Sequence, residues 1–280
     1  MKYRPMKNRY PQLVLACMVI SFAAVLAGCA GSNSNLPNLP AASASQRDMA
    51  SASDETELRR RARLRLELAA VYFEEGKTNI ALDEIKQSVA IDPNFADAFI
   101  LRGLVYMRLN DMAMAEDSFR RALTINPRDA DAAHNYGWLL CQQTRYADAN
   151  RLFMQATAIP TYAGKAKTFM VQGLCQSRAG LNAEAERSLT QSYELDAGNP
   201  VTGYNLASLL YARNELTRAQ FYIRRINNSD LANAETLWLG IKTERKLNNP
   251  EAARQLADQL KKRFGQSTQA FSYEKGLFNE

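Results

Sequence analysis

The strongest chemical signal in this chain is the stretch Leu26-Ala27-Gly28-Cys29, in which small residues stand directly before a cysteine. A positively charged segment and a short apolar run from Leu13 to Leu26 precede it. The four charges are Lys2, Arg4, Lys7 and Arg9. Together these features predict a lipoprotein signal peptide over residues 1–28. The thiol of Cys29 would be diacylated, and Cys29 would then become the new N-terminus.

An uncleaved transmembrane anchor is the alternative explanation for the same segment. It fits less well because the apolar run, about 14 residues long, is shorter than the ~20 residues needed to cross a bilayer. Ala30 follows the cysteine where an aspartate could have stood. In bacteria with two membranes this favours the outer membrane, so we expect a lipid-anchored protein on its periplasmic face.

The remaining residues offer little material for catalysis. His134 is the only histidine, and no cysteine and histidine cluster has the spacing of metal ligands. The sequence contains no phosphate-binding or nucleophile motif of the GxGxxG, GxxxxGK[ST] or GxSxG type. Paired acids such as Glu74-Glu75 and Asp83-Glu84 fit solvated helix faces better than an active site. We therefore predict no catalytic site, no metal and no cofactor apart from the lipid on Cys29.

Two cysteines would remain as thiols after export, since Cys17 leaves with the signal and Cys29 is acylated. These are Cys141 and Cys175, which fall on neighbouring helices of the repeat described below. In an oxidising compartment they could form a disulfide, and two buried free cysteines are the alternative.

The net charge does not support binding to nucleic acid. The formal charge of the whole chain is +6, but the signal segment carries four basic and no acidic side chains, so the charge falls to +2 without it. The aromatic residues also follow helical core spacing and do not alternate with basic ones.

Residues 29–56 are expected to be a flexible tether. They are rich in Ser, Ala, Asn and Pro and contain almost no large apolar residue that could be buried. A run of arginines follows at Arg59, Arg60, Arg61, Arg63 and Arg65. It could contact acidic lipid or a partner, but we favour a solvated helix face whose arginines pair with nearby acids.

The stretch from Ala96 to Pro127 sets the fold. Its apolar and small residues recur at positions 4, 8, 11, 20, 24, 27 and 32 of a 34-residue unit, which is the tetratricopeptide pattern. They are Phe99, Gly103, Tyr106, Ala115, Phe119, Ala122 and Pro127. One such unit is a pair of antiparallel helices, and a single pair cannot bury its apolar face alone. The sequence therefore predicts an all-α solenoid of six helix pairs over residues 57–264.

The register of the six units is supported by the residues between paired helices. Six residues fall at matching turn positions, one in every unit, where glycine or asparagine can adopt left-handed geometry. They are Gly76, Asn110, Thr144, Gly180, Asn214 and Asn248. An insertion of two residues at 160–164 separates units three and four and should bend or bulge the stack. The tail, residues 265–280, could pack as a capping helix or fray.

The first helix of each unit is expected to line a concave groove. The lining positions carry apolar residues where a purely structural repeat could carry polar ones. They are Leu66, Phe73, Ile100, Leu104, Met107, His134, Trp138, Met170, Leu174 and Tyr204. We predict that an apolar or amphipathic segment of a partner protein binds there. The alternative is that superhelical curvature, or the chain's own tail, buries these side chains.

Three stretches resemble one known family more closely than the repeat requires. They are HNYGWLLC (134–141), PTY (160–162) and GLCQSRAG (173–180). With the lipidation signal, the tether and the six repeats, they resemble the PilF/PilW family of outer-membrane pilotin lipoproteins of type IV pilus machines. The likeness spans nearly the whole chain.

This resemblance implies a right-handed superhelix that binds the pilus secretin and promotes its outer-membrane localisation, multimerisation or stability. It also favours the disulfide, because some members carry cysteines equivalent to Cys141 and Cys175. We expect a monomer when the protein is free. A different function remains open, namely an adaptor that recruits a periplasmic peptidase or cell-wall hydrolase.

Overall fold

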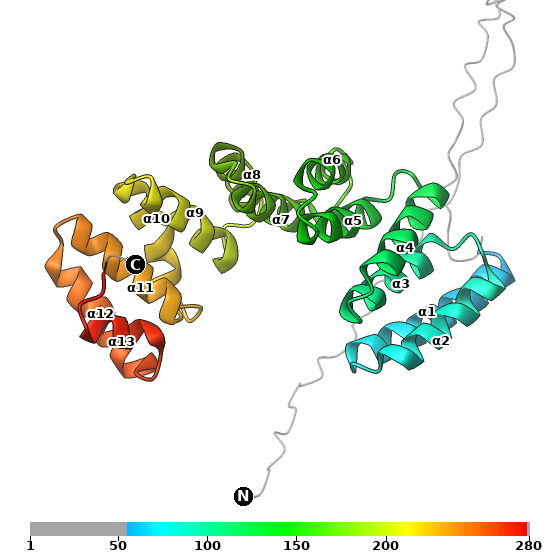
Figure 1. Cartoon of the computed structure of the whole chain (residues 1–280), viewed down its shortest axis with the longest axis horizontal. Coiled ribbons are helices and arrows are strands. Elements are labelled where there is room, and N and C mark those ends of the chain that lie inside the picture. The colour runs from blue at the N-terminus through cyan, green and yellow to red at the C-terminus, as the bar shows by residue number, and fades with distance from the viewer. Residues whose placement is uncertain (1–54, 279–280) are drawn as a thin grey trace, which may run out of the picture. The chain divides into compact units, whose positions relative to one another are not determined.

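The computed structural model describes residues 55–278, which lie within one compact unit of the chain. Cys29, the signal segment and all but the end of the 29–56 segment lie outside these residues. The described part folds into thirteen α-helices without a strand (Figure 1). None of these helices combines the length and the apolarity needed to cross a bilayer.

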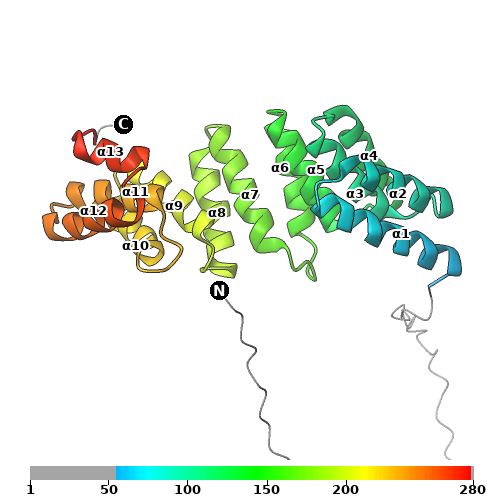
Figure 2. The ribbon, with the colours of Figure 1, turned by 90° about the horizontal axis from the view of Figure 1, so that it is seen from below.

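Twelve of the helices form six consecutive pairs, as the repeat predicted (Figures 1 and 2). The pairs are α1 (Glu57–Glu74) with α2 (Thr78–Ile91), α3 (Ala96–Arg108) with α4 (Met112–Ile125), α5 (Ala130–Gln142) with α6 (Tyr146–Thr157), α7 (Lys165–Arg178) with α8 (Asn182–Leu195), α9 (Pro200–Ala212) with α10 (Leu216–Asn227), and α11 (Ala234–Lys246) with α12 (Pro250–Phe264). Each second helix also contacts the first helix of the next pair, so the pairs stack as a solenoid.

Small residues on the first helix let the second helix approach closely within a pair. Gly103 on α3 faces Phe119 on α4, and Gly137 on α5 faces Phe153 on α6. Both phenylalanine side chains are fully buried. The core positions predicted from the repeat are therefore confirmed, and the interlocking of a glycine with a ring explains why position 8 must be small.

The turns inside the pairs confirm the predicted register. All six predicted turn residues have a positive φ angle, between 57° and 77°. Glycine and asparagine adopt this geometry at little cost. Thr144, with φ of 60°, is the β-branched member of the set.

The connection between α6 and α7 is longer than those between most other pairs and contains the predicted insertion. Tyr162 lies within it, and its hydroxyl donates to Asp131 Oδ1 on α5 over 3.3 Å. The same hydroxyl accepts a hydrogen bond from Thr168 on α7. The insertion is thus tied to the helices on both of its sides.

Arginines on α1 and α3 are held by carboxylates within the fold. Arg59 pairs with Asp92, Arg63 with Glu55 and Glu67, and Arg65 with Glu84. This agrees with the solvated, ion-paired face that we favoured over a lipid-binding one. Arg102 on α3 lies over the Phe99 ring, donates to Ser118 Oγ and pairs with Asp117.

The tail forms a short capping helix, α13 (Thr268–Glu274), that packs on α11 and α12. Beyond it, Phe278 stacks on Trp238 of α11 with 5.2 Å between the ring centroids. The Arg245 guanidinium lies 3.7 Å from the centroid of the same Phe278 ring. The tail therefore covers the α11 surface around Trp238, which is in register with the predicted groove residue Tyr204.

Candidate functional site

The helices that carry the predicted groove residues lie next to one another. Contacts join α1 to α3, α3 to α5, α5 to α7, and α7 to α9. Nine of the ten predicted residues are partly exposed, and the tenth, His134, is buried. The structure thus brings the predicted residues onto one row of neighbouring first helices.

These side chains also pack between repeats, which the sequence analysis did not assign to them. Leu104 and Met107 pack against the cluster formed by Ala115, Phe119 and Leu139. Trp138 and Met170 pack in the same way around the Cys141 and Cys175 cluster. Inter-repeat packing therefore accounts for part of the apolar character of this surface, as the alternative explanation supposed. The nine partly exposed side chains also keep part of their surface open to solvent.

Cations cover three aromatic rings of these first helices. Arg108 lies 3.6 Å from the Phe73 ring centroid, Arg178 5.3 Å from that of Trp138, and Lys246 4.3 Å from that of Tyr211. In each case the cation belongs to the repeat that follows the ring. Such contacts are worth about 0.5–1 kcal/mol at exposed sites. The sequence analysis missed them because ring and cation stand at least 35 positions apart.

These three cations have no ion-pair partner among residues 55–278, whereas the α1 arginines Arg59, Arg63 and Arg65 are paired with carboxylates. The row of first helices therefore presents partly exposed apolar side chains beside Arg108 and Arg178, which have no carboxylate partner among residues 55–278. A partner segment with apolar and acidic residues would complement it.

His134 is a structural residue and not an open groove position. Only 5% of it is exposed, and its Nδ1 lies 2.8 Å from Thr168 Oγ1. Burial, with a smaller contribution from the Lys167 charge, lowers its pKa to about 4. The ring is therefore neutral at pH 7. It joins α5 to α7 beside the insertion loop, since Thr168 also bonds Tyr162.

Cys141 and Cys175 form a disulfide between α5 and α7, with their Cα atoms 5.9 Å apart. Both residues are almost fully buried. The bond joins units three and four at the point where the insertion lengthens their connection. Within the described residues no three His, Cys, Asp or Glu side chains are grouped as metal ligands.

Comparison with known proteins identifies relatives that match most of this chain. The tetratricopeptide repeat family matches residues 96–129. The type IV pilus assembly protein PilF of Pseudomonas aeruginosa is 28% identical over 197 residues, which are 70% of this chain and 78% of PilF.

Comparison with solved structures also identifies type IV pilus proteins. The structure of Pseudomonas aeruginosa PilF matches with a TM-score of 0.71 and 24% identity, covering 79% of this chain and all of the PilF chain. PilW, described as a widely conserved type IV pilus biogenesis factor, matches with a TM-score of 0.67 and 28% identity, covering 76% of this chain and 97% of PilW. Neither relative is described as an enzyme. The chain is a tetratricopeptide-repeat protein homologous to PilF and similar in structure to PilF and PilW.

Proposed function

We propose that this protein is an outer-membrane lipoprotein of type IV pilus biogenesis that binds the pilus secretin through the row of first helices α1, α3, α5, α7 and α9. The observation that carries this proposal is homology to PilF over 70% of this chain. The partly exposed apolar side chains of the same helices, with Arg108 and Arg178 that pair with no carboxylate in the described part of the chain, support a protein partner and not a small substrate.

Lipid on Cys29 would hold the protein at the inner leaflet of the outer membrane. The segment between Cys29 and α1 would keep the repeats near that leaflet, where secretin subunits insert. Restricting both proteins to one surface raises their effective concentration, so capture does not require a tight interface. Bound repeats would also shield apolar secretin surface until the subunits assemble.

Co-purification of the secretin with leucine variants of α1 and α3 tests this binding. Leu66→Ser and Leu104→Ser together remove apolar area from the proposed surface, so secretin recovery should fall at least about tenfold. Leu195→Ser is the matched control, because Leu195 is 57% exposed on α8, away from the first-helix row. Circular dichroism must show that all variants remain helical.

Equal secretin recovery with the double variant and the control would contradict the proposed surface. Recovery of a peptidase or wall hydrolase in place of the secretin would instead support the adaptor function.

A further inference from the structure

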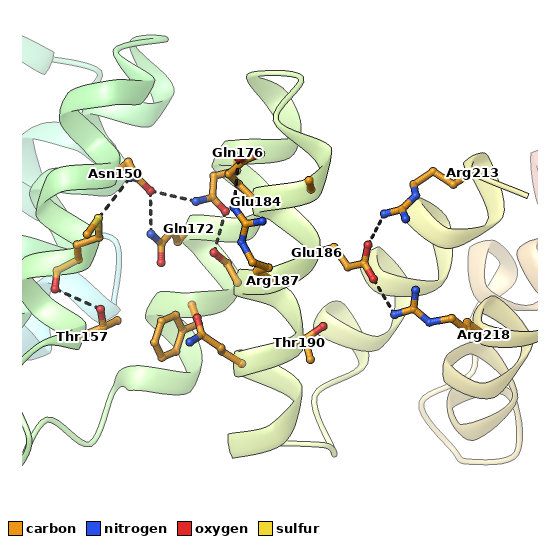
Figure 3. Close-up of a pocket in the computed structure, with 15 residues that line it drawn as sticks. Asn150, Thr157, Gln172, Gln176, Glu184, Glu186, Arg187, Thr190, Arg213 and Arg218 are labelled. Atoms are coloured by element: carbon orange, nitrogen blue, oxygen red, sulfur yellow. Dashed lines mark hydrogen bonds and ion pairs between the residues drawn. The ribbon is translucent and has the colours of Figure 1, made fainter. Parts of the chain in front are cut away.

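A second cleft opens on the other side of the solenoid, between the second helices α6 and α8, with α7 as its floor (Figure 3). The wide part has a volume of about 900 Å³. A more enclosed part of about 530 Å³ continues beside it toward Tyr146 and Leu181. These volumes lie in the range of pockets that hold small ligands or short peptide segments.

The amino-acid sequence explains why the cleft forms at this unit. Positions 7 and 11 of the first helix face the space between consecutive second helices, and in two units both carry large aromatic or apolar side chains. Unit three has Tyr136 and Leu140 there, and unit five has Leu206 and Leu210. Unit four has Gln172 and Gln176. Polar amides thus occupy both positions at the unit that follows the insertion.

The amides form an incomplete hydrogen-bond network. Asn150 Oδ1 on α6 accepts from Gln172 Nε2 at 2.8 Å and from Gln176 Nε2 at 3.0 Å. Gln176 Oε1 in turn accepts from Ser188 Oγ at 2.8 Å. Figure 3 shows the three amides meeting across the floor of the cleft. Gln176 therefore satisfies both ends of its amide within the protein.

Gln172 and Asn150 keep unused capacity that faces the cleft. Only 6% of Gln172 is exposed, yet its Oε1 accepts no hydrogen bond from residues 55–278. Within the same residues, Asn150 Nδ2 donates only to the Met154 sulfur, at 3.5 Å, and a thioether is a weak acceptor. Neither atom belongs to the fully buried polar atoms without a partner, which in residues 55–278 are Tyr193 Oη and Asn227 Oδ1. Gln172 Oε1 and Asn150 Nδ2 are therefore open to the cleft, and an occupant can form hydrogen bonds with them in place of water.

The charges around the cleft neutralise one another. Arg187 pairs with Glu184, and Arg213 and Arg218 both pair with Glu186 and with Glu215, so three arginines face three glutamates. Figure 3 shows the last two arginines converging on Glu186 at the far rim. Such a rim gives no net attraction for an ionic ligand. The free acceptor on Gln172 and the free donor on Asn150 match the N–H and C=O of a peptide group.

The walls of the enclosed part are apolar. Tyr146, Phe153, Cys175 and Ala179 line it, and Leu181 stands at its rim with 48% of its surface exposed. Met154, on the wide part, is 58% exposed. An apolar side chain of an occupant would cover these groups while its backbone reached the amides.

We propose that the cleft between α6 and α8 binds an extended, uncharged peptide segment of a partner protein. One apolar side chain of the segment enters the pocket beside Tyr146 and Leu181. The adjoining peptide group donates to Gln172 Oε1 and accepts from Asn150 Nδ2. This site is separate from the first-helix row and does not depend on the secretin proposal.

Titration of the ¹⁵N-labelled full chain with acetyl-leucyl-alanine methylamide tests the site by NMR. Saturable shifts should appear in α6, α7 and α8 and in the side-chain amides of Asn150 and Gln172. The charged analogue acetyl-glutamyl-alanine methylamide should bind at least about tenfold more weakly.

Two variants locate the binding. Gln172→Leu introduces the residue that unit five carries at this position and removes the acceptor, and Ala147→Trp fills the enclosed part from an exposed position on α6. Both should weaken binding at least about tenfold, whereas Gln259→Leu, an exposed glutamine on α12, should leave it unchanged. The proposal is overturned if the NMR shifts do not saturate or if the charged probe binds as tightly as the uncharged one. It is also overturned if Gln172→Leu, Ala147→Trp and Gln259→Leu all have the same affinity for the uncharged probe.

Discussion

Gly103 packs so closely against Phe119 that a Cβ atom at residue 103 would lie 2.6 Å from the ring. Phe119 cannot move away easily, because its side chain is fully buried among Ala115 and Leu139. The same relationship joins Gly137 to Phe153 in the next pair. Contact between a glycine and a ring therefore sets the distance between the helices of units two and three.

Gly103→Ala should accordingly destabilise the solenoid although alanine favours helices. We expect a net loss of about 1–3 kcal/mol in the free energy of unfolding from overpacking. Gly198→Ala is the control, because the nearest atom to a Cβ there is 3.4 Å away, and it should change stability by less than about 0.5 kcal/mol. Urea denaturation of both variants measures the difference, and equal midpoints would contradict the packing argument.

Thr144→Asn should stabilise the protein. Thr144 holds a φ of 60°, which a β-branched side chain adopts at a cost of about 1 kcal/mol and asparagine tolerates better. Thr124→Asn is the control, because Thr124 occupies an exposed helical position on α4 and has no strain to relieve. Thermal unfolding should show a higher Tm for Thr144→Asn alone, and an unchanged or lower Tm would show that the turn is not strained.

The burial of His134 predicts a pH dependence of stability. Its folded pKa of about 4 lies below the ordinary value of ~6.5, so protonation favours the unfolded chain. The stability that comes from burying His134 in its neutral form is present above pH ~6.5 and is lost as the pH falls toward 4. At pH 5 the loss should be about 2 kcal/mol.

His134→Gln removes this titration while retaining a group that can bond Thr168. The difference in unfolding free energy between wild type and this variant should therefore shrink between pH 7 and pH 5. A difference that stays constant over this range would mean that His134 is not buried in its neutral form.

The cations over the aromatic rings give a prediction about partner binding. Arg108→Glu reverses a charge at the rim of the first-helix row, so secretin binding should weaken and lose part of its salt dependence. Arg128→Glu is the matched control, since Arg128 is exposed in the turn before α5. Surface plasmon resonance at two salt concentrations compares them, and identical affinities would exclude the cations from the interface.

The helix pairs were predictable from the sequence because their determinants are local. Ala115, Phe119 and Ala122 recur at fixed spacing, and Asn110 and Asn214 mark turns at one position of the unit. Each helix end follows from residues within a few positions of it. This locality is a property of solenoids, in which each repeat contacts only its neighbours.

The site was less predictable because it depends on contacts between repeats. His134 occupies a groove position in sequence, but Thr168 and the insertion loop bury it. The pairing of Arg108 with Phe73 depends on the distance between successive repeats. The α6–α8 cleft left a sequence signal at Gln172 and Gln176, two amides at positions that units three and five fill with large aromatic or apolar residues.

Secretin multimer abundance in outer membranes of cells lacking this protein tests the central proposal most directly. We predict that multimers fall sharply, with monomeric secretin accumulating or mislocalised, and that wild-type protein restores them. A Cys29→Ser form should restore them poorly, because it lacks the lipid anchor. Unchanged multimer abundance and placement in the deletion strain would contradict the proposed function.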